Sequence, residues 1–162
     1  MSEAASSPQG IYPVSLLDQL PGLSWPEKLA YLTVKFLALP QIECPVVHKF
    51  EGGEYIREIA IPQGTLFIGR PHRHGHKCDL LSGKIIHITQ DFRLQRIAPF
   101  SIKTAPGYQA VFYTETDILG RSVHPNPTDS RDIEALELDA FHTVDEMKAL
   151  GMEAAHKLKQ VA

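Results

Sequence analysis

Residues 65–89 read TLFIGRPHRHGHKCDLLSGKIIHIT, and this stretch decides the fold class. It holds three short runs rich in apolar and β-branched residues, at 65–70, 79–81 and 84–89. A histidine-rich segment and the turn Ser82-Gly83 separate these runs. Short apolar runs bounded by Gly, Pro and Asp are typical of β-strands.

The same pattern continues outward, from Glu43 to about Val123. Further strands are predicted at 45–50, 55–61, 94–97, 101–104, 110–114 and 121–124. Many short strands at close, regular spacing predict a sandwich or a barrel. Helical segments do not alternate with them, which argues against a parallel α/β sheet. We therefore expect a mainly β protein with an antiparallel barrel over residues 43–126.

Helices are expected at both flanks of this region. Ser24 and Glu27 have the spacing of a capping box, with a Pro between them, and this predicts an N-terminal helix over 24–40 that packs on the barrel. Thr143 and Glu146 repeat the capping pattern and predict a helix in a C-terminal extension over 127–162. Residues 1–23 are predicted to be a polar N-terminal tail.

Bulk properties limit the classes of function. The chain has 162 residues, which is the size of one domain, and a formal net charge of −3, which argues against a nucleic-acid partner. Neither a signal sequence nor an apolar run of membrane-spanning length is evident, so a cytoplasmic location without membrane contact is expected. Two cysteines make no disulfide framework, as in a reducing compartment.

Three histidines at alternate positions, His72, His74 and His76, are the main candidates for chemistry. On an extended strand, residues two apart point to one face, and imidazole is the commonest protein ligand for metals. A divalent metal (Zn, Fe, Ni or Mn) held by these histidines and a remote donor is one interpretation, with His124 the best remote donor and His87 another. A solvated polar strand end is the alternative, and Gly75 leaves the direction of His74 open.

Other side chains could add to such a site. Asp79, Tyr113 and Glu115 are candidate catalytic groups for proton transfer, or oxygen donors. Cys78 could supply a thiolate, although packing in the core is the more common role of a free cysteine.

Residues 68–83 resemble the first motif of the cupin superfamily. Counted back from Gly83, His76 falls on the carboxylate position of that motif, His72 on its second histidine and Arg70 on its first. Residues 105–110 resemble the second motif, with Ala110 in place of its histidine. The resemblance implies a jelly-roll barrel with a modified site built from His72, His76 and a donor such as His124.

A further resemblance, over residues 45–138, is to small cupin-like proteins encoded by tailed bacteriophages. It is carried by His72, His76, Leu81-Ser82-Gly83, Val123-His124-Pro125, Thr128-Asp129 and residues 132–137. It implies an uncharacterised or structural module of a virion or its assembly, made in the host cytoplasm. Homo-oligomers, other virion proteins and a small-molecule ligand are the partners expected. The alternative is a metal-dependent cupin enzyme of the dioxygenase, isomerase or lyase type that uses His72, His76 and His124.

Overall fold

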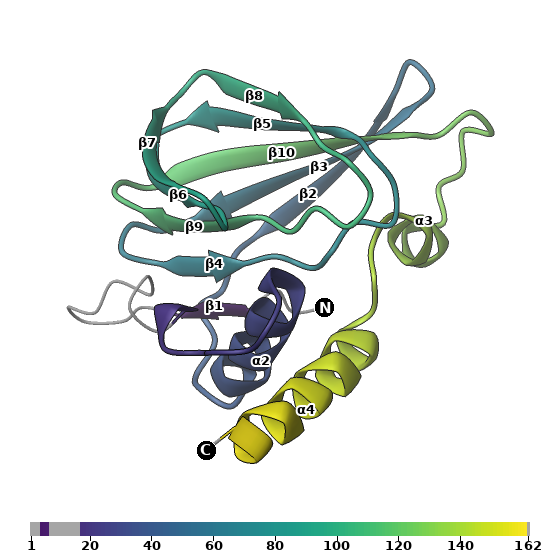
Figure 1. Ribbon diagram of the computed structural model, residues 1–162. Helices are drawn as coiled ribbons and strands as arrows, with labels where there is room; N and C mark the ends of the chain where they lie inside the picture. Colours follow the sequence, from purple (N-terminus) through teal and green to yellow (C-terminus); the bar gives the residue numbers. More distant parts are fainter. Residues whose placement is uncertain (1–3, 7–16, 162) are drawn as a thin grey trace.

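A computed structural model describes residues 4–6 and 17–161. Two five-stranded antiparallel sheets face one another, and helices lie below and beside them (Figure 1). The helix-side sheet has the strand order β1-β4-β9-β6-β7, and the far sheet has the order β2-β3-β10-β5-β8. The strands are β1 (Ala4–Ser6), β2 (Val46–Glu51), β3 (Glu54–Ile61), β4 (Leu66–Ile68), β5 (Lys77–Ser82), β6 (Lys84–Ile88), β7 (Arg93–Ile97), β8 (Phe100–Lys103), β9 (Val111–Thr114) and β10 (Ile118–Pro125).

The strands from β3 to β10 pair in a nested order. β3 pairs with β10, β4 with β9, β5 with β8 and β6 with β7, so the first strand pairs with the last and the series closes inward. The lateral pairs β5·β10 and β6·β9 fold this long hairpin into two sheets. This is the topology of a jelly roll, and it confirms the mainly β fold class predicted from the sequence.

The helix-side sheet buries a different set of side chains on each of its two faces. Leu66, Ile68 and Val111 of the helix-side sheet pack against helix α2 (Trp25–Leu37), which Ser24 caps through both halves of a capping box. Phe67 and Phe112 alternate with these residues and point into the barrel, where their rings stack. All three residues of β4 are therefore buried, which explains its continuous apolar sequence.

The N-terminal residues differ from the polar tail predicted over 1–23. Ala4–Ser6 form the edge strand β1 against β4, and Leu17, Leu20 and Leu23 are buried in the core between the helices and the sheet. These three leucines cover apolar surface of the core. The polar residues at the start of the chain give no indication of this in the sequence. The remainder of the predicted tail, residues 1–3 and 7–16, lies outside the described residues.

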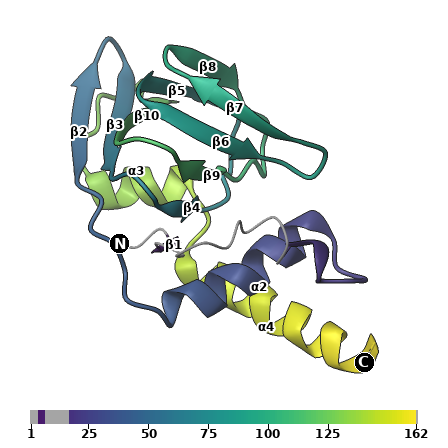
Figure 2. The ribbon, with the colours of Figure 1, turned by 90° about the vertical axis from the view of Figure 1, so that its left-hand side faces the viewer.

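The C-terminal residues form two helices, α3 (Ile133–Ala140) at one end of the barrel and α4 (Val144–Val161) beside α2 (Figure 2). Gly151 of α4 lies so close to α2 that an added Cβ would be 2.7 Å from the carbonyl oxygen of Ala30. A glycine that weakens an isolated helix thus permits two helices to approach. In the part of the chain described, no helix is both long enough and apolar enough to cross a membrane.

Candidate metal centre

His72 lies in the connection from β4 to β5, at the mouth of the barrel. Its backbone N–H donates to the carbonyl of Tyr108 (2.8 Å), and its carbonyl accepts from the N–H of Gly107 (2.7 Å). The side chain is buried against the rings of Tyr108 and Phe141. Its Nδ1 has no hydrogen-bond partner among the described residues, which is uncommon for a buried polar atom.

The ring of His76 is held through its Nδ1. Its Nδ1 lies 3.2 Å from the carbonyl oxygen of His74 and 3.3 Å from Oγ1 of Thr104. A carbonyl only accepts, so this contact favours the tautomer that carries the proton on Nδ1. Nε2 is then left with its lone pair, which is the form in which a histidine binds a metal.

Cys78 completes a group of three donors. It follows His76 by two residues on β5, and its Sγ lies 3.3 Å from Nε2 of His76. One donor atom each from His72, His76 and Cys78 lie within 4.8 Å of one another. In a tetrahedral zinc site with two nitrogens and a sulfur, donors are about 3.5 Å apart. The sequence favoured core packing for Cys78, but the structure places it among the donors.

His124 lies beside this donor group, on β10. Its ring centroid is 4.4 Å from that of His76 and 6.3 Å from that of His72. Its Nε2 lies 2.9 Å from Oγ of Ser122, on the same strand. The structure thus brings the three predicted histidines His72, His76 and His124 together, but the ring of His124 lies tilted against that of His76, and its Nε2 is within hydrogen-bond distance of Ser122.

His74, the fourth predicted ligand, is not part of this group. Its side chain is 63% exposed and points towards Asp139, with Nε2 3.6 Å from the carboxylate. The chain bends at Arg73 and His74, which interrupts the alternation, and Gly75 then passes so close to Thr104 that an added Cβ would lie 2.6 Å from its carbonyl oxygen. The chain therefore does not run straight from His72 to His76.

The candidate catalytic residues lie away from the donors. Asp79 is on the face of β5 opposite Cys78, where it accepts from Ser101 (2.5 Å) and from Nε of Arg121 (2.8 Å). Burial alone would raise the pKa of Asp79, but these hydrogen bonds lower it below its usual value. Tyr113 alternates with Phe112 on β9 and therefore lies on the face of the sheet that meets the helices. Glu115 lies just beyond the end of β9, where its carboxylate accepts a hydrogen bond from Gln95.

Burial keeps the histidines neutral. It lowers the pKa of His72 to about 2, with further contributions from the neighbouring histidines and from Arg57 and Arg70. Burial likewise lowers the pKa of His124 to about 3, and it lowers that of His76. Neutral imidazole is the form that binds metals, so these rings need lose no proton at neutral pH.

A wall of aromatic and charged groups closes one side of the site. The guanidinium carbons of Arg57 and Arg70 lie 4.9 and 4.7 Å from the ring centroid of Phe141, which is itself buried against His72 and His124. Glu137 of α3 pairs with both arginines, at 3.2 and 3.8 Å. Helix α3 thus places a carboxylate next to two buried cations and a ring over the histidines.

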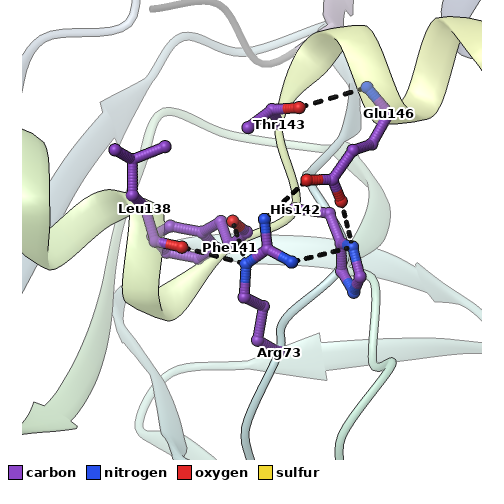
Figure 3. Close-up of polar contacts among 6 residues, drawn as sticks. All are labelled: Arg73, Leu138, Phe141, His142, Thr143 and Glu146. Atoms are coloured by element: carbon purple, nitrogen blue, oxygen red, sulfur yellow. Dashed lines mark hydrogen bonds and ion pairs between the residues drawn. The ribbon is translucent and has the colours of Figure 1, made fainter.

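Arg73, between His72 and His74, ties this wall to the donor loop (Figure 3). Its Nε donates to the carbonyls of Leu138 (2.9 Å) and Phe141 (3.0 Å), and Nη2 donates to Glu146 (2.6 Å). The guanidinium therefore satisfies backbone carbonyls at the end of α3 and a side chain in the first turn of α4. The local sequence carries no signal for this role, because the partners of Arg73 lie about 70 residues away.

The sequence matches no protein-family model and no curated protein. Similar solved structures include an acetylacetone dioxygenase from Acinetobacter johnsonii, with 15% identity and a TM-score of 0.40, covering 51% of this chain and 58% of that one. A cupin-2 domain protein from Shewanella frigidimarina has 10% identity, a TM-score of 0.40 and coverages of 58% and 91%. An RmlC-like cupin with a double-stranded β-helix fold, from Methanocaldococcus jannaschii, has 9% identity, a TM-score of 0.41 and coverages of 56% and 89%.

This chain spans less than two thirds of the length of the dioxygenase that it matches. The nested strand pairing carries the fold assignment. In fold, the chain is a mainly β jelly roll made of two antiparallel sheets, with an N-terminal helix and C-terminal helices.

Proposed function

We propose that this protein is a metal-binding module that holds one divalent transition-metal ion through His72, His76 and Cys78. The observation that carries the proposal is the clustering of three donor atoms, one from each residue, within 4.8 Å of one another. Exposed acidic clusters of that size are common, but these donors are two buried imidazoles and a half-buried thiol.

The chemistry of the donor set favours zinc. Two imidazoles and one thiolate match the borderline softness of Zn²⁺, and three protein ligands leave a fourth position for water or a small ligand. When bound, such an ion would act as a Lewis acid that polarises a carbonyl or activates water. Nδ1 of His72 is buried without a hydrogen-bond partner among the described residues, and Nε2 of His76 faces Sγ of Cys78, so both nitrogens are candidates for coordination.

The surroundings provide access and space. A surface cavity of about 320 Å³, lined in part by Lys103 and Thr104, reaches His76 from outside. On the inner side of the donors, a cavity of about 80 Å³ inside the barrel is lined by Cys78, Tyr108 and apolar side chains such as Leu80 and Phe112. An ion could enter by the first, and the second has room for only a few atoms of a bound molecule.

Metal analysis tests this proposal. The full chain, freed of metal by a chelator and dialysed against a small excess of zinc, should retain about one equivalent by elemental analysis. His76→Gln and Cys78→Ala should each lose most of this zinc. Cys44→Ala is the matched control, because Cys44 packs beside the barrel core and its substitution should leave the stoichiometry unchanged. Protein that retains no zinc, iron, nickel or manganese would refute the proposal.

A catalytic role would follow from an open coordination position. The enzyme alternative, a dioxygenase, isomerase or lyase, used His124 as the third ligand. In this structure His124 bonds Ser122, so it is better placed as a neighbour that could accept or donate a proton beside the donors. Reconstituted His124→Gln protein should then keep its zinc, whereas the three-histidine alternative requires that it lose the metal.

The resemblance of the sequence to phage-encoded proteins implies a role in assembly, and this role remains a prediction. One observation favours self-association: Leu94 and Ile97 are 46% and 58% exposed on β7, an edge strand of the helix-side sheet. Exposed apolar edge strands are templates for pairing with a second chain. Light scattering during size exclusion should show a defined oligomer that Leu94→Lys with Ile97→Lys dissociates, and a monomeric parent protein would oppose this role.

A further inference from the structure

A second cavity, of about 480 Å³, lies between helices α2 and α4 and the loops that follow β6 and β8. None of the three metal donors lines it, so it is distinct from the candidate metal centre. Its volume is within the range of small-molecule sites, and such sites combine an apolar wall with a few polar groups.

The wall of the cavity is apolar on the side of the two helices. Trp25 and Leu29 line it from α2, and Met147 and Leu150 line it from α4, with Ile88 at the end of β6. An indole and four apolar side chains form a surface that favours a ligand with an apolar ring or a short hydrocarbon chain over a polar ligand.

The polar groups gather where the barrel meets the cavity. His87, Tyr108 and Gln109 line it there, and the hydroxyl of Tyr108 lies 3.5 Å from Nε2 of His87. Among the residues that the structure describes, Nδ1 of His87 and Nε2 of Gln109 have no hydrogen-bond partner. Buried polar atoms nearly always have one, so a bound molecule with a hydrogen-bonding head group would supply what these residues lack.

The charges around the cavity favour an uncharged head group. Burial and the nearby charge of Arg96 lower the pKa of His87, so this ring is neutral at neutral pH. The carboxylate of Glu146, which also lines the cavity, is held by Arg73 and His142. A cation placed beside His87 would meet the like charge of Arg96, and an anion would share the cavity with the carboxylates of Asp91 and Glu146, so either would lose its hydration without a clear gain.

We propose that this cavity is a second ligand site, for a small uncharged molecule with a ring-sized apolar body and one amide, carbonyl or hydroxyl head group. The body packs against Trp25 and Leu150, and the head group meets His87 and Gln109. None of the metal donors lines this site, although it shares His87 and Tyr108 with the small cavity beside Cys78.

Trp25 provides the readout, because it is the only tryptophan of the chain. The full chain is titrated with three probes that share one skeleton: 3-phenylpropionamide, 3-phenylpropionate and 3-phenylpropylamine. The amide should change Trp25 fluorescence saturably and raise the melting temperature. It should bind at least about tenfold more tightly than the two charged probes, because their burial carries an unpaid desolvation cost.

Two variants test the placement of the ligand. Gln109→Leu removes the amide with little change in volume and should weaken binding of 3-phenylpropionamide by about tenfold, which corresponds to one hydrogen bond to a buried group. Gln160→Leu, at an exposed position near the end of α4, is the matched control and should bind as the parent does. Leu150→Phe enlarges the side chain in the wall and should also weaken binding.

Several results would overturn the proposal. Absence of saturable binding of the amide to the parent chain would do so, including the case in which a second copy fills the cavity. Equal affinity for all three probes would remove the uncharged head group from the assignment. Unchanged affinity in both Gln109→Leu and Leu150→Phe would place the ligand elsewhere. If Gln109→Leu does not fold, the three probes and Leu150→Phe still decide.

Discussion

Sγ of Cys78 lies 3.3 Å from Nε2 of His76, the nitrogen that His76 does not direct at the carbonyl of His74. His76 directly precedes β5 and Cys78 is the second residue of that strand, so one short segment carries both donors. His72 reaches the same point from the connection before that strand. The chemistry of the site therefore depends on how this one segment is held.

Cobalt spectroscopy provides a test of thiolate ligation. The metal-free chain loaded with Co²⁺ should show a sulfur-to-cobalt charge-transfer band in the near ultraviolet, because a thiolate donates charge to the ion. Cys78→Ser should lose that band, and Cys44→Ser should keep it. A spectrum that is unchanged in Cys78→Ser would remove the thiol from the ligand set.

The stability of the metal-free protein should depend on pH below neutrality. His72 and His124 have folded pKa values of about 2 and 3, whereas an unfolded histidine titrates near 6.5. Below that pH the unfolded chain takes up protons that the folded chain does not, so the free energy of unfolding falls as pH falls. Each such histidine contributes about 1.4 kcal/mol per pH unit once its unfolded form is titrated.

Urea unfolding at pH 7, 6 and 5, with a chelator present, measures this slope. His124→Leu should show a shallower slope between pH 6 and 5 than the parent chain. Substitution of the exposed His156 is the control, and it should leave the slope unchanged. A free energy of unfolding that is independent of pH over this range would contradict the neutral state of the buried rings.

Removal of the ring of Phe141 should destabilise the barrel mouth. Phe141 is 1% exposed and contacts two histidines and two guanidinium groups. Phe141→Ala should lower the free energy of unfolding by about 3–5 kcal/mol, as for other buried aromatic residues. Leu138→Ala, in the helix that Phe141 follows but half-exposed, should cost less than about 1 kcal/mol by the same urea measurement. Equal effects of the two substitutions would argue against the packing of Phe141.

Arg73→Lys should loosen the junction between α3 and α4 while the barrel stays folded. A lysine cannot donate at once to two carbonyls and a carboxylate in the fixed geometry of a guanidinium. Hydrogen exchange of the amides at 141–146 should therefore become faster. Arg131→Lys, whose ion pair with Asp129 is exposed, should exchange at the parent rate. Unchanged protection in Arg73→Lys would mean that packing alone fixes the junction.

Asp79→Asn should affect the stability of the fold but not the binding of metal. Asp79 pairs with Arg121 and accepts from Ser101 on the face of β5 that points away from the donors. The substitution should lower the free energy of unfolding by about 1–2 kcal/mol, since Arg121 is partly exposed and water screens the pair. Zinc stoichiometry should be unchanged, and loss of metal in Asp79→Asn would place the carboxylate in the site.

The fold could be predicted because its signal is local. Short β-branched runs and their Gly and Pro breakers mark the strands within a few residues, and the nested pairing follows once they form a jelly roll. The N-terminal leucines were missed because polar residues precede them, and local composition does not show which apolar residues find a surface to cover.

The site could be predicted only in part, because convergence is a property of the tertiary structure. His72, His76 and His124 were identified by type and spacing, and they lie together. The bend at Arg73 and His74 separates His74 from the other histidines. It is accompanied by a close approach of Gly75 to Thr104, a contact distant in sequence that local patterns do not reveal. Cys78 carried a local signal, its alternate position after His76, but the usual preference of cysteine for apolar packing outweighed it.

The nested strand order has a consequence for the synthesis of this protein. Tyr55 and His124 face one another across the outermost pair, β3 and β10, which are separated by more than half of the strand region. A chain that has left the ribosome only as far as β9 already contains His72, His76 and Cys78, but it lacks the strand against which β3 and β5 both pair. Contacts so distant in sequence form late. A growing chain therefore presents the imidazoles of His72 and His76 and the thiol of Cys78 before the barrel around them has closed.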